Sequence, residues 1–202
     1  MASIPTNSVA TLVLASSSPY RRQLLDRLGL DFSVDAPQVD ERPLSGESPA
    51  GLVERLAQLK ARTVAHRNPG AIVIGSDQLA LRDDEVLGKP GTEMAAIDQL
   101  SRCSGKSVEF LTAVAVIDGR QSKAECRTHL DVTRVEFRAL QPAEINAYVV
   151  RDKPLDCAGG FRCEGLGIAL FKRIDSSDPT GLIGLPLIWL STALRELGVD
   201  LL

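Results

Sequence analysis

Serines, a proline and arginines stand together in a segment whose side chains suit the binding of phosphate. The segment ASSSPYRRQLL, residues 15–25, follows a short apolar run, and its first serine is Ser16. Serine at the N-cap and proline at the first position favour the start of a helix, whose free N–H groups and dipole attract phosphate. Arg21 and Arg22 could add charge-assisted hydrogen bonds. An ordinary capped helix with solvated arginines is the alternative that needs no ligand.

Two acidic segments could supply metal ligands or a general base. Asp40 and Glu41 are adjacent in PQVDERP, and carboxylate oxygens are ligands that Mg²⁺ prefers. Asp77 lies in GSDQ directly after the apolar run AIVIG, so we expect it at the carboxyl end of a buried strand, where α/β sheets bind ligands. There it could act as a general base or a metal ligand. For Asp40 and Glu41 the alternative without a function is a solvated polar loop. For Asp77 it is an Asx turn that ends the strand.

Two lysines could place point charges beside a phosphate. Lys89 lies between glycine and proline in GKP, and Lys60 lies on a predicted helix face beside Ala57 and Ala61. Both could reach the same cleft. An exposed turn explains Lys89 equally well, and Lys60 could instead extend from a buried helix face to solvent.

The segment CAGGFRCEG, residues 157–165, could recognise a base. Its paired glycines allow a ligand to approach the backbone closely. Glu164 could accept two hydrogen bonds from the N1–H and N2–H₂ groups of a guanine. A tight loop with an exposed acid is the alternative. Cys157 and Cys163 resemble a redox pair, but their neighbours in the sequence do not favour a lowered thiol pKa.

The composition is that of an ordinary globular domain. The 202 residues are 44% hydrophobic and 24% charged, which excludes a disordered, collagen-like or disulfide-stapled chain. A net charge of −3 argues against a broad nucleic-acid-binding surface but not against a local basic pocket. No apolar run reaches the about 18 residues of a membrane helix, and residues 1–10 lack the pattern of a secretory signal. We therefore expect a cytoplasmic protein of one domain, residues 1–202, with a flexible lead-in at 1–10.

The cysteines and histidines predict neither a zinc site nor a catalytic histidine. Four cysteines occur, none of them in a C-x-x-C pair: Cys103, Cys126, Cys157 and Cys163. We expect them to be reduced thiols. Neither His66 nor His129 accompanies a serine or cysteine nucleophile motif, so we expect no catalytic role for either.

Alternating strand-like and helix-like segments predict an α/β fold. Apolar or β-branched segments predict strands at 11–15, 32–36, 71–75, 108–117, 128–137 and 167–174. Capping residues and apolar periodicity predict helices that start at 19, 49 and 93 and helices over 142–150 and 186–197. The long pair of strands that turns at Asp118-Gly119 indicates a mixed sheet.

The order of these motifs is more specific than any one of them. From about Leu12 to Leu202 the chain contains LASSSPYRR, VDE, RLAQLKA, GSDQ, GKP, CAGGFRCEG and DPTGLIGLPL, and it resembles the Maf family of nucleotide pyrophosphatases. The resemblance implies an elongated fold similar to that of the inosine triphosphate pyrophosphatases, with a bent mixed sheet and a cleft between two lobes. It also implies hydrolysis of a nucleoside triphosphate to the monophosphate and pyrophosphate with a divalent cation, Mg²⁺ or Mn²⁺.

The resemblance implies roles for individual residues. Asp77 matches the proton acceptor and Glu41 the acid of the VDE motif, so these two carboxylates are the expected metal ligands. Four residues match the family's phosphate contacts: Ser16, Arg21, Lys60 and Lys89. The expected catalytic set is Arg21, Lys60, Lys89, Asp77 and Glu41.

Three positions divide the family by substrate: Tyr20, Gln78 and Glu164. In the branch that acts on dTTP and UTP they are usually arginine, threonine and glutamine. The set in this chain resembles the bacterial YceF-like branch, which acts on 7-methyl-GTP and has tryptophan in place of Tyr20. The chemistry agrees, because an aromatic face attracts the cationic 7-methylguanine ring and Glu164 would pair with its N1/N2 edge and its charge. A uracil or thymine would suit a glutamine amide better.

Two other functions remain open. One is a dTTP/UTP or broad non-standard nucleotide pyrophosphatase. The other is a non-catalytic nucleotide-binding regulator of septum formation. The intact set of Glu41, Lys60, Asp77 and Lys89 argues against it, because a pure binder has no reason to keep a water-activating acid. The resemblance also implies a role in removing modified nucleotides before they enter nucleic acid. A homodimer is a further expectation, and no nucleic-acid or membrane partner is expected.

Overall fold

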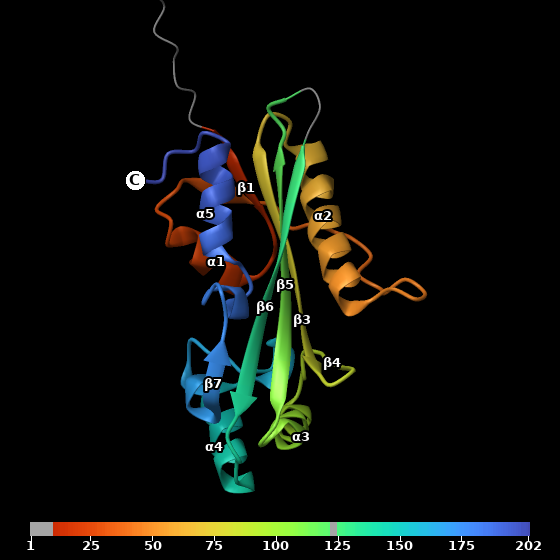
Figure 1. Ribbon diagram of the computed structural model, residues 1–202, viewed down its shortest axis with the longest axis vertical. Coiled ribbons are helices and arrows are strands. Elements are labelled where there is room, and N and C mark those ends of the chain that lie inside the picture. The colour runs from red at the N-terminus through yellow and green to blue at the C-terminus, as the bar shows by residue number, and fades with distance from the viewer. Residues whose placement is uncertain (1–9, 122–124) are drawn as a thin grey trace, which may run out of the picture.

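The computed structural model describes residues 10–121 and 125–202, which form an elongated α/β structure (Figure 1). The predicted lead-in therefore lies, except for Ala10, outside the described residues. Long strands run through the centre, and helices lie on both faces of the sheet (Figure 1). No helix in the described part of the chain is long and apolar enough to cross a membrane.

The strands form one mixed sheet in the order β2-β1-β3-β5-β6-β7, with β4 paired to β3. β1 is parallel to both of its neighbours, whereas the pairs β3–β5, β5–β6 and β6–β7 are antiparallel. The bounds are β1 (Leu12–Ala15), β2 (Phe32–Val34), β3 (Ile72–Arg82), β4 (Glu85–Leu87), β5 (Ser107–Asp118), β6 (Cys126–Phe137) and β7 (Phe171–Asp175). The predicted α/β class and mixed sheet are confirmed.

The strand predicted over 167–174 is wrong in its first half. Leu166–Leu170 forms a short 3-10 helix, η2, and β7 begins only at Phe171. The backbone of Gly167 packs against Arg162, where a Cβ would lie 2.3 Å from the carbonyl oxygen. The chain therefore turns back onto the preceding loop before it can extend as a strand.

The helices begin where the capping residues predict. In three helices a side-chain oxygen of the N-cap residue accepts a hydrogen bond from the backbone N–H of the third helical residue. These caps are Ser18 for α1 (Pro19–Asp26), Ser48 for α2 (Pro49–Arg67) and Thr92 for α3 (Glu93–Cys103). The remaining helices are α4 (Pro142–Asp152) and α5 (Leu187–Glu196).

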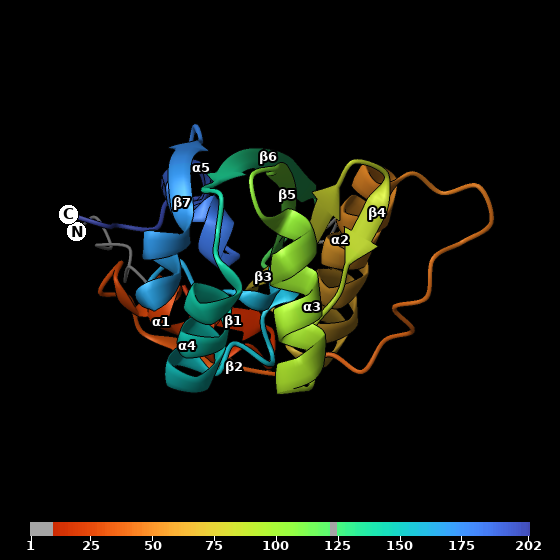
Figure 2. The ribbon, with the colours of Figure 1, turned by 90° about the horizontal axis from the view of Figure 1, so that it is seen from below.

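Buried side chains form three clusters that divide the molecule into two lobes. In one lobe α2 packs on one face of the sheet and α1 and α5 pack on the other. The other lobe contains α3, α4 and β7, and Figure 2 shows α3 and α4 side by side at this end. Its core is aromatic, with ring centroids 4.7 to 5.6 Å apart among Phe110, Phe137, Phe161 and Phe171.

Gly75 sets the distance between α2 and β3. A Cβ at this position would lie 2.4 Å from the carbonyl oxygen of Ala57 and 2.7 Å from the backbone nitrogen of Ala61. We expect Gly75→Ala to lower the free energy of unfolding by about 1–3 kcal/mol, because overpacked cores force the backbone to shift. Urea denaturation measures the change. Gly88→Ala is the matched control, since a Cβ there meets nothing within 4 Å, and equal stability of the two variants would contradict this account.

Candidate active site

The candidate site lies at a gap in the sheet along one edge of β3. β1 pairs with β3 as far as Ala15 opposite Gly75, and β4 pairs with β3 from Ala80 onward. On this edge no described strand pairs with residues 76–79, whereas β5 pairs with the other edge throughout. The gap exposes the edge of β3 directly beyond the carboxyl end of β1.

The prediction that a strand ends at Gly75 is therefore wrong, and so is the Asx-turn alternative for Asp77. β3 continues because β5 supplies a partner for each residue from Ile72 to Leu81. The strand that ends is β1, in register with Gly75. Asp77 lies two residues beyond Gly75. It is therefore at the carboxyl end of a parallel strand, as expected, but that strand is the neighbouring β1 and not β3, which contains Asp77.

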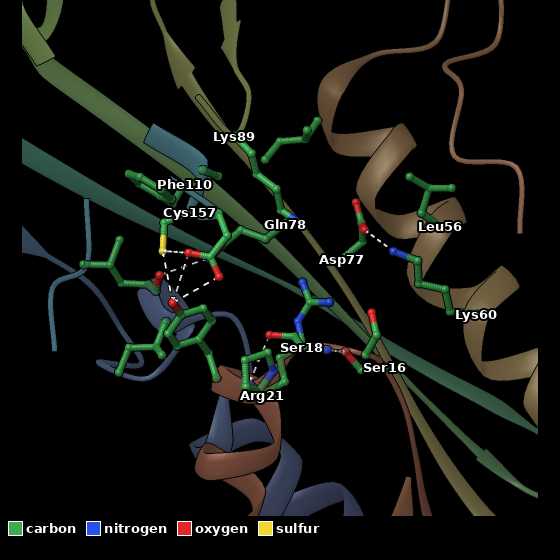
Figure 3. Close-up of a pocket in the computed structure, with 18 of the residues that line it drawn as sticks. Ser16, Ser18, Arg21, Leu56, Lys60, Asp77, Gln78, Lys89, Phe110 and Cys157 are labelled. Carbon is green, nitrogen blue, oxygen red and sulfur yellow. Dashed lines mark hydrogen bonds and ion pairs between the residues drawn. The ribbon is translucent and has the colours of Figure 1, made fainter. Parts of the chain in front are cut away.

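A cavity of about 490 Å³ opens at this gap. Arg22 and Asp40, which the sequence also offered for phosphate and metal, do not line it. The structure does bring to its wall every residue to which the family resemblance gives a role, several of them labelled in Figure 3. These residues are Ser16, Tyr20, Arg21, Glu41, Lys60, Asp77, Gln78, Lys89 and Glu164. They come from the β1–α1 segment, the loop before α2, α2, β3, the loop after β4 and the loop after the short 3-10 helix η1 (Ala158–Gly160). Their roles stay predictions, but the structure shows that these residues line one cavity.

Lys60 joins the two predicted metal-binding carboxylates. Its Nζ lies 2.6 Å from Oδ1 of Asp77 and 2.7 Å from Oε1 of Glu41. The side chains of Lys60 and Asp77 are only 8% and 10% exposed, whereas that of Glu41 is 59% exposed. Lys60 therefore does not extend from its helix to bulk solvent. It turns into the cavity and fixes the position of the Asp77 carboxylate.

The start of α1 forms another part of the wall. Ser18 caps the helix, and Oγ of Ser16 accepts a hydrogen bond of 3.1 Å from the backbone N–H of Ser18. Arg21 donates from Nε to the carbonyl of Gly184 at 2.9 Å, which leaves its terminal nitrogens available to a ligand. Burial lowers the pKa of the Arg21 guanidinium, and the charges of Asp77 and Glu41 oppose this change. The solvated-arginine alternative fits only Arg22, which is exposed.

The amide of Gln78 is held in one orientation. Its Nε2 donates to the carbonyls of Gly181 and Leu182 at 3.0 and 3.1 Å and to Oγ1 of Thr112 at 2.8 Å. Because carbonyl oxygens only accept hydrogen bonds, this atom must be the nitrogen. The amide oxygen Oε1 is then the group of Gln78 that a ligand can use, and it is an acceptor.

Tyr20 and Glu164 lie beside the cysteines of the glycine-rich loop. The Tyr20 hydroxyl accepts a weak hydrogen bond from Sγ of Cys157 at 3.6 Å, and Sγ of Cys163 lies 3.4 Å from Oε2 of Glu164. Burial raises the pKa of each thiol to about 12. Both thiols are therefore neutral at physiological pH, which argues against a reactive redox pair.

A buried network on α4 holds the loop that carries Glu164. The Tyr148 hydroxyl donates to Oδ2 of Asp152 at 2.8 Å, and Arg162 pairs with Oδ1 of Asp152 at 2.6 Å. The backbone N–H of Arg162 donates in turn to the Tyr148 hydroxyl at 3.0 Å. Gly165 packs so closely on Asp152 that a Cβ would lie 2.9 Å from Oδ1. The position of Glu164 is thus set from outside the cavity.

Sequence reasoning missed the residues that position the site. The carbonyl of Gly184 accepts from both Arg21 and Ser76, each at 2.9 Å. Gly184 has a φ of 124°, in the region that favours glycine. The motif DPTGLIGLPL contains it, but a main-chain acceptor leaves no signal in side-chain types. Asp156 also lines the cavity. The only feature of the sequence that could have pointed to it is its position next to Cys157.

The carboxylates at the cavity fit a cation that arrives with substrate. Within the described residues no group of three or more His, Cys, Asp or Glu side chains is placed to hold a metal ion alone. Glu41 and Asp77 provide two carboxylates, and Mg²⁺ is commonly held by one or two carboxylates together with substrate phosphates.

Comparison with known proteins agrees with the geometry. The family model described as "Maf-like protein" matches residues 11–197. A 7-methyl-GTP pyrophosphatase of Xanthomonas oryzae pv. oryzae is 55% identical over 190 residues, which are 94% of this chain and 98% of the relative. A 7-methyl-GTP pyrophosphatase of Nitrosococcus oceani is 47% identical over 199 residues, 98% of this chain and 99% of the relative. The structure of a HAM1 protein from Coxiella burnetii has a TM-score of 0.50 and 18% identity over 93% of this chain and 99% of that one, which indicates a shared fold.

Proposed function

The chain belongs to the family of Maf-like proteins, and from this premise we propose that it hydrolyses 7-methyl-GTP to 7-methyl-GMP and pyrophosphate. The observation that carries the proposal is the cavity at the β3 gap. It joins a buried acid, three cationic side chains and a set of base-recognising groups in one space. Figure 3 shows Lys60 and Asp77 on one side of it, Cys157 on the other and Gln78 between them.

The acid and the cations suit attack by water on a phosphorus atom. Asp77 accepts a proton from water, the oxygen bonds to the α-phosphorus, and the bond from that phosphorus to the bridging oxygen breaks. Pyrophosphate leaves with the electron pair. Arg21, Lys60 and Lys89 stabilise the negative charge that develops on the phosphate oxygens. Glu41 and Asp77 would hold a divalent cation, which would supply further charge neutralisation.

The base-recognising groups suit guanine better than uracil or thymine. Glu164 and Oε1 of Gln78 are both acceptors, because the amide nitrogen of Gln78 is already bound by the protein. The N1–H and N2–H₂ groups of guanine are both donors, so each meets an acceptor. Uracil and thymine present one N–H between two carbonyls, and these carbonyls would face acceptors. The face of Tyr20 adds attraction for a cationic ring.

We expect Glu164→Gln to lower kcat/KM for 7-methyl-GTP by about 10- to 100-fold, because a hydrogen bond to a charged group contributes about 1.5–3 kcal/mol. The loss for UTP should be smaller, since an amide also donates to its carbonyls. Pyrophosphate release measures both substrates. Glu109→Gln, on an exposed strand position, is the control. An unchanged ratio of the two substrates in Glu164→Gln would contradict this role.

A substrate panel tests the proposed function. Pyrophosphate release is measured with 7-methyl-GTP, GTP, dTTP, UTP and CTP, with Mg²⁺ and with Mn²⁺. Preferred turnover of 7-methyl-GTP supports the proposal. Preferred turnover of dTTP or UTP would favour the other enzymatic function, and nucleotide binding without pyrophosphate release would favour the regulator.

The metal requirement, the cytoplasmic location and the homodimer stay predictions that accompany this proposal. The same holds for the absence of nucleic-acid and membrane partners and for the removal of modified nucleotides before they enter nucleic acid. Loss of turnover on chelation with EDTA, restored by Mg²⁺ or Mn²⁺, would support the metal.

A further inference from the structure

Asp156 is a second carboxylate on the base-recognising side of the cavity. It lines the cavity together with Tyr20, Cys157 and Glu164. Its Oδ1 and Oδ2 lie 3.2 and 3.3 Å from the Tyr20 hydroxyl, and Sγ of Cys157 lies 3.5 Å from Oδ1. Asp156 is exposed, and among the described residues no ion pair involves it.

The hydrogen bond between Tyr20 and Asp156 has one direction. Burial raises the pKa of the Tyr20 hydroxyl well above its ordinary value, and the nearby Cys157 and Asp156 raise it further. The phenol therefore stays protonated and donates to the carboxylate. This contact orients the aromatic ring and places a full negative charge at its hydroxyl end. Both effects increase the attraction of the ring for a cation.

The charges of Asp156 and Glu164 act on the same region. Both carboxylates line the same cavity as Cys157, and both contribute, after burial, to raising the pKa of its thiol. The guanidinium of Arg162 acts in the opposite direction, since it lowers the pKa of the Tyr20 hydroxyl, but it is itself paired with Asp152 at 2.6 Å. The base side of the cavity is therefore negative, whereas the phosphate side contains the cationic residues Arg21 and Lys89.

The pattern of donors on the N1/N2 edge does not separate a methylated guanine from an unmethylated one. Both bases present the same N1–H and N2–H₂ donors, so a single acceptor group at that edge serves both. They differ in charge, since only the 7-methylated ring is a cation. Discrimination between them depends on negative charge near the base. Glu164 contributes to that charge, and Asp156 adds a second carboxylate in the same cavity.

We propose that Asp156 is a further specificity-determining residue, which selects a cationic purine base over neutral guanine through its charge and through its hydrogen bond with Tyr20. This inference rests on the proposed function. It assigns to Glu164 the guanine edge and part of the attraction for the cationic ring, and to the Asp156–Tyr20 pair a further part of that attraction.

The test is Asp156→Asn, which keeps an oxygen acceptor for Tyr20 but removes the charge. The ratio of kcat/KM for 7-methyl-GTP to kcat/KM for GTP should fall about tenfold, and Asp156→Ala should lower it at least as far. In the parent, this ratio should also fall with added salt, more steeply than in Asp156→Asn, because salt screens exposed charges. Asp26→Asn, an exposed site on α1, is the matched control and should keep the parent ratio.

The two proposals fail in different ways. A parent that does not hydrolyse 7-methyl-GTP would overturn the proposed function. A parent that prefers 7-methyl-GTP, with an unchanged ratio and salt dependence in Asp156→Asn, would overturn the role of Asp156 alone. Equilibrium binding of 7-methyl-GMP and GMP to the parent and to Asp156→Asn reports on the inference without turnover, and equal preference in both proteins would also overturn it.

Discussion

Asp77→Asn is expected to lower kcat for 7-methyl-GTP by about 10²- to 10⁴-fold, the range that a positioned general base contributes. Asparagine keeps the size of the side chain and an oxygen that can accept the 2.6 Å hydrogen bond from Nζ of Lys60. It cannot accept a proton from water. Lys60 also keeps its 2.7 Å contact with Glu41, so the fold should survive. Single-turnover pyrophosphate release measures the loss, and thermal unfolding checks the fold.

The matched control for this substitution is Asp98→Asn, the same chemical change on the exposed face of α3. It should leave kcat unchanged. Near-normal kcat in Asp77→Asn would reject the role of Asp77 as proton acceptor. Normal kcat with a large rise in KM would instead assign it to substrate or metal binding.

The sequence predicts the helices of this fold well because their signals are local. Ser18, Ser48 and Thr92 each cap a helix through their own hydroxyl, and proline follows the first two. The residues of the cavity could also be predicted, since their side-chain types and the order of their motifs are visible in the chain. What assembles them is β1, α2 and β3, which meet at Gly75.

The errors concern features that depend on partners outside the segment itself. The polar residues of GSDQ indicate the end of a strand, yet β3 continues because β5 pairs with it. The polarity instead marks the place where the other edge of β3 is open to the cavity. The segment from Gly167 has the composition of a strand, but its contact with Arg162 imposes a turn.

The anchoring of Arg21 and the pairing of Tyr20 with Asp156 depend on residues far away in the chain. Gly184 contributes a main-chain carbonyl, and any residue type has one. Asp156 lies 136 positions from Tyr20, and only the fold brings them together. Such contacts decide how a predicted site residue is oriented, which a motif does not specify.

Lys60→Met is the second substitution with a large expected effect. Methionine has a similar length but no charge, so the phosphate loses one cation and Asp77 loses its partner. We expect kcat/KM for 7-methyl-GTP to fall about 10²- to 10³-fold, as when one preorganised charge-stabilising donor is removed. The free energy of unfolding should fall by about 1–3 kcal/mol, because the side chain of Asp77 is only 10% exposed and is left unpaired.

The double variant Lys60→Met/Asp77→Asn separates these two effects. Removing the unpaired carboxylate should restore part of the stability that Lys60→Met loses, whereas activity should stay as low as in Asp77→Asn, because the two residues act as a unit. Lys172→Met, whose side chain is 67% exposed, should change neither property. Urea denaturation and pyrophosphate release measure the cycle. Additive losses of stability in the double variant would show that the contact between Lys60 and Asp77 does not couple them.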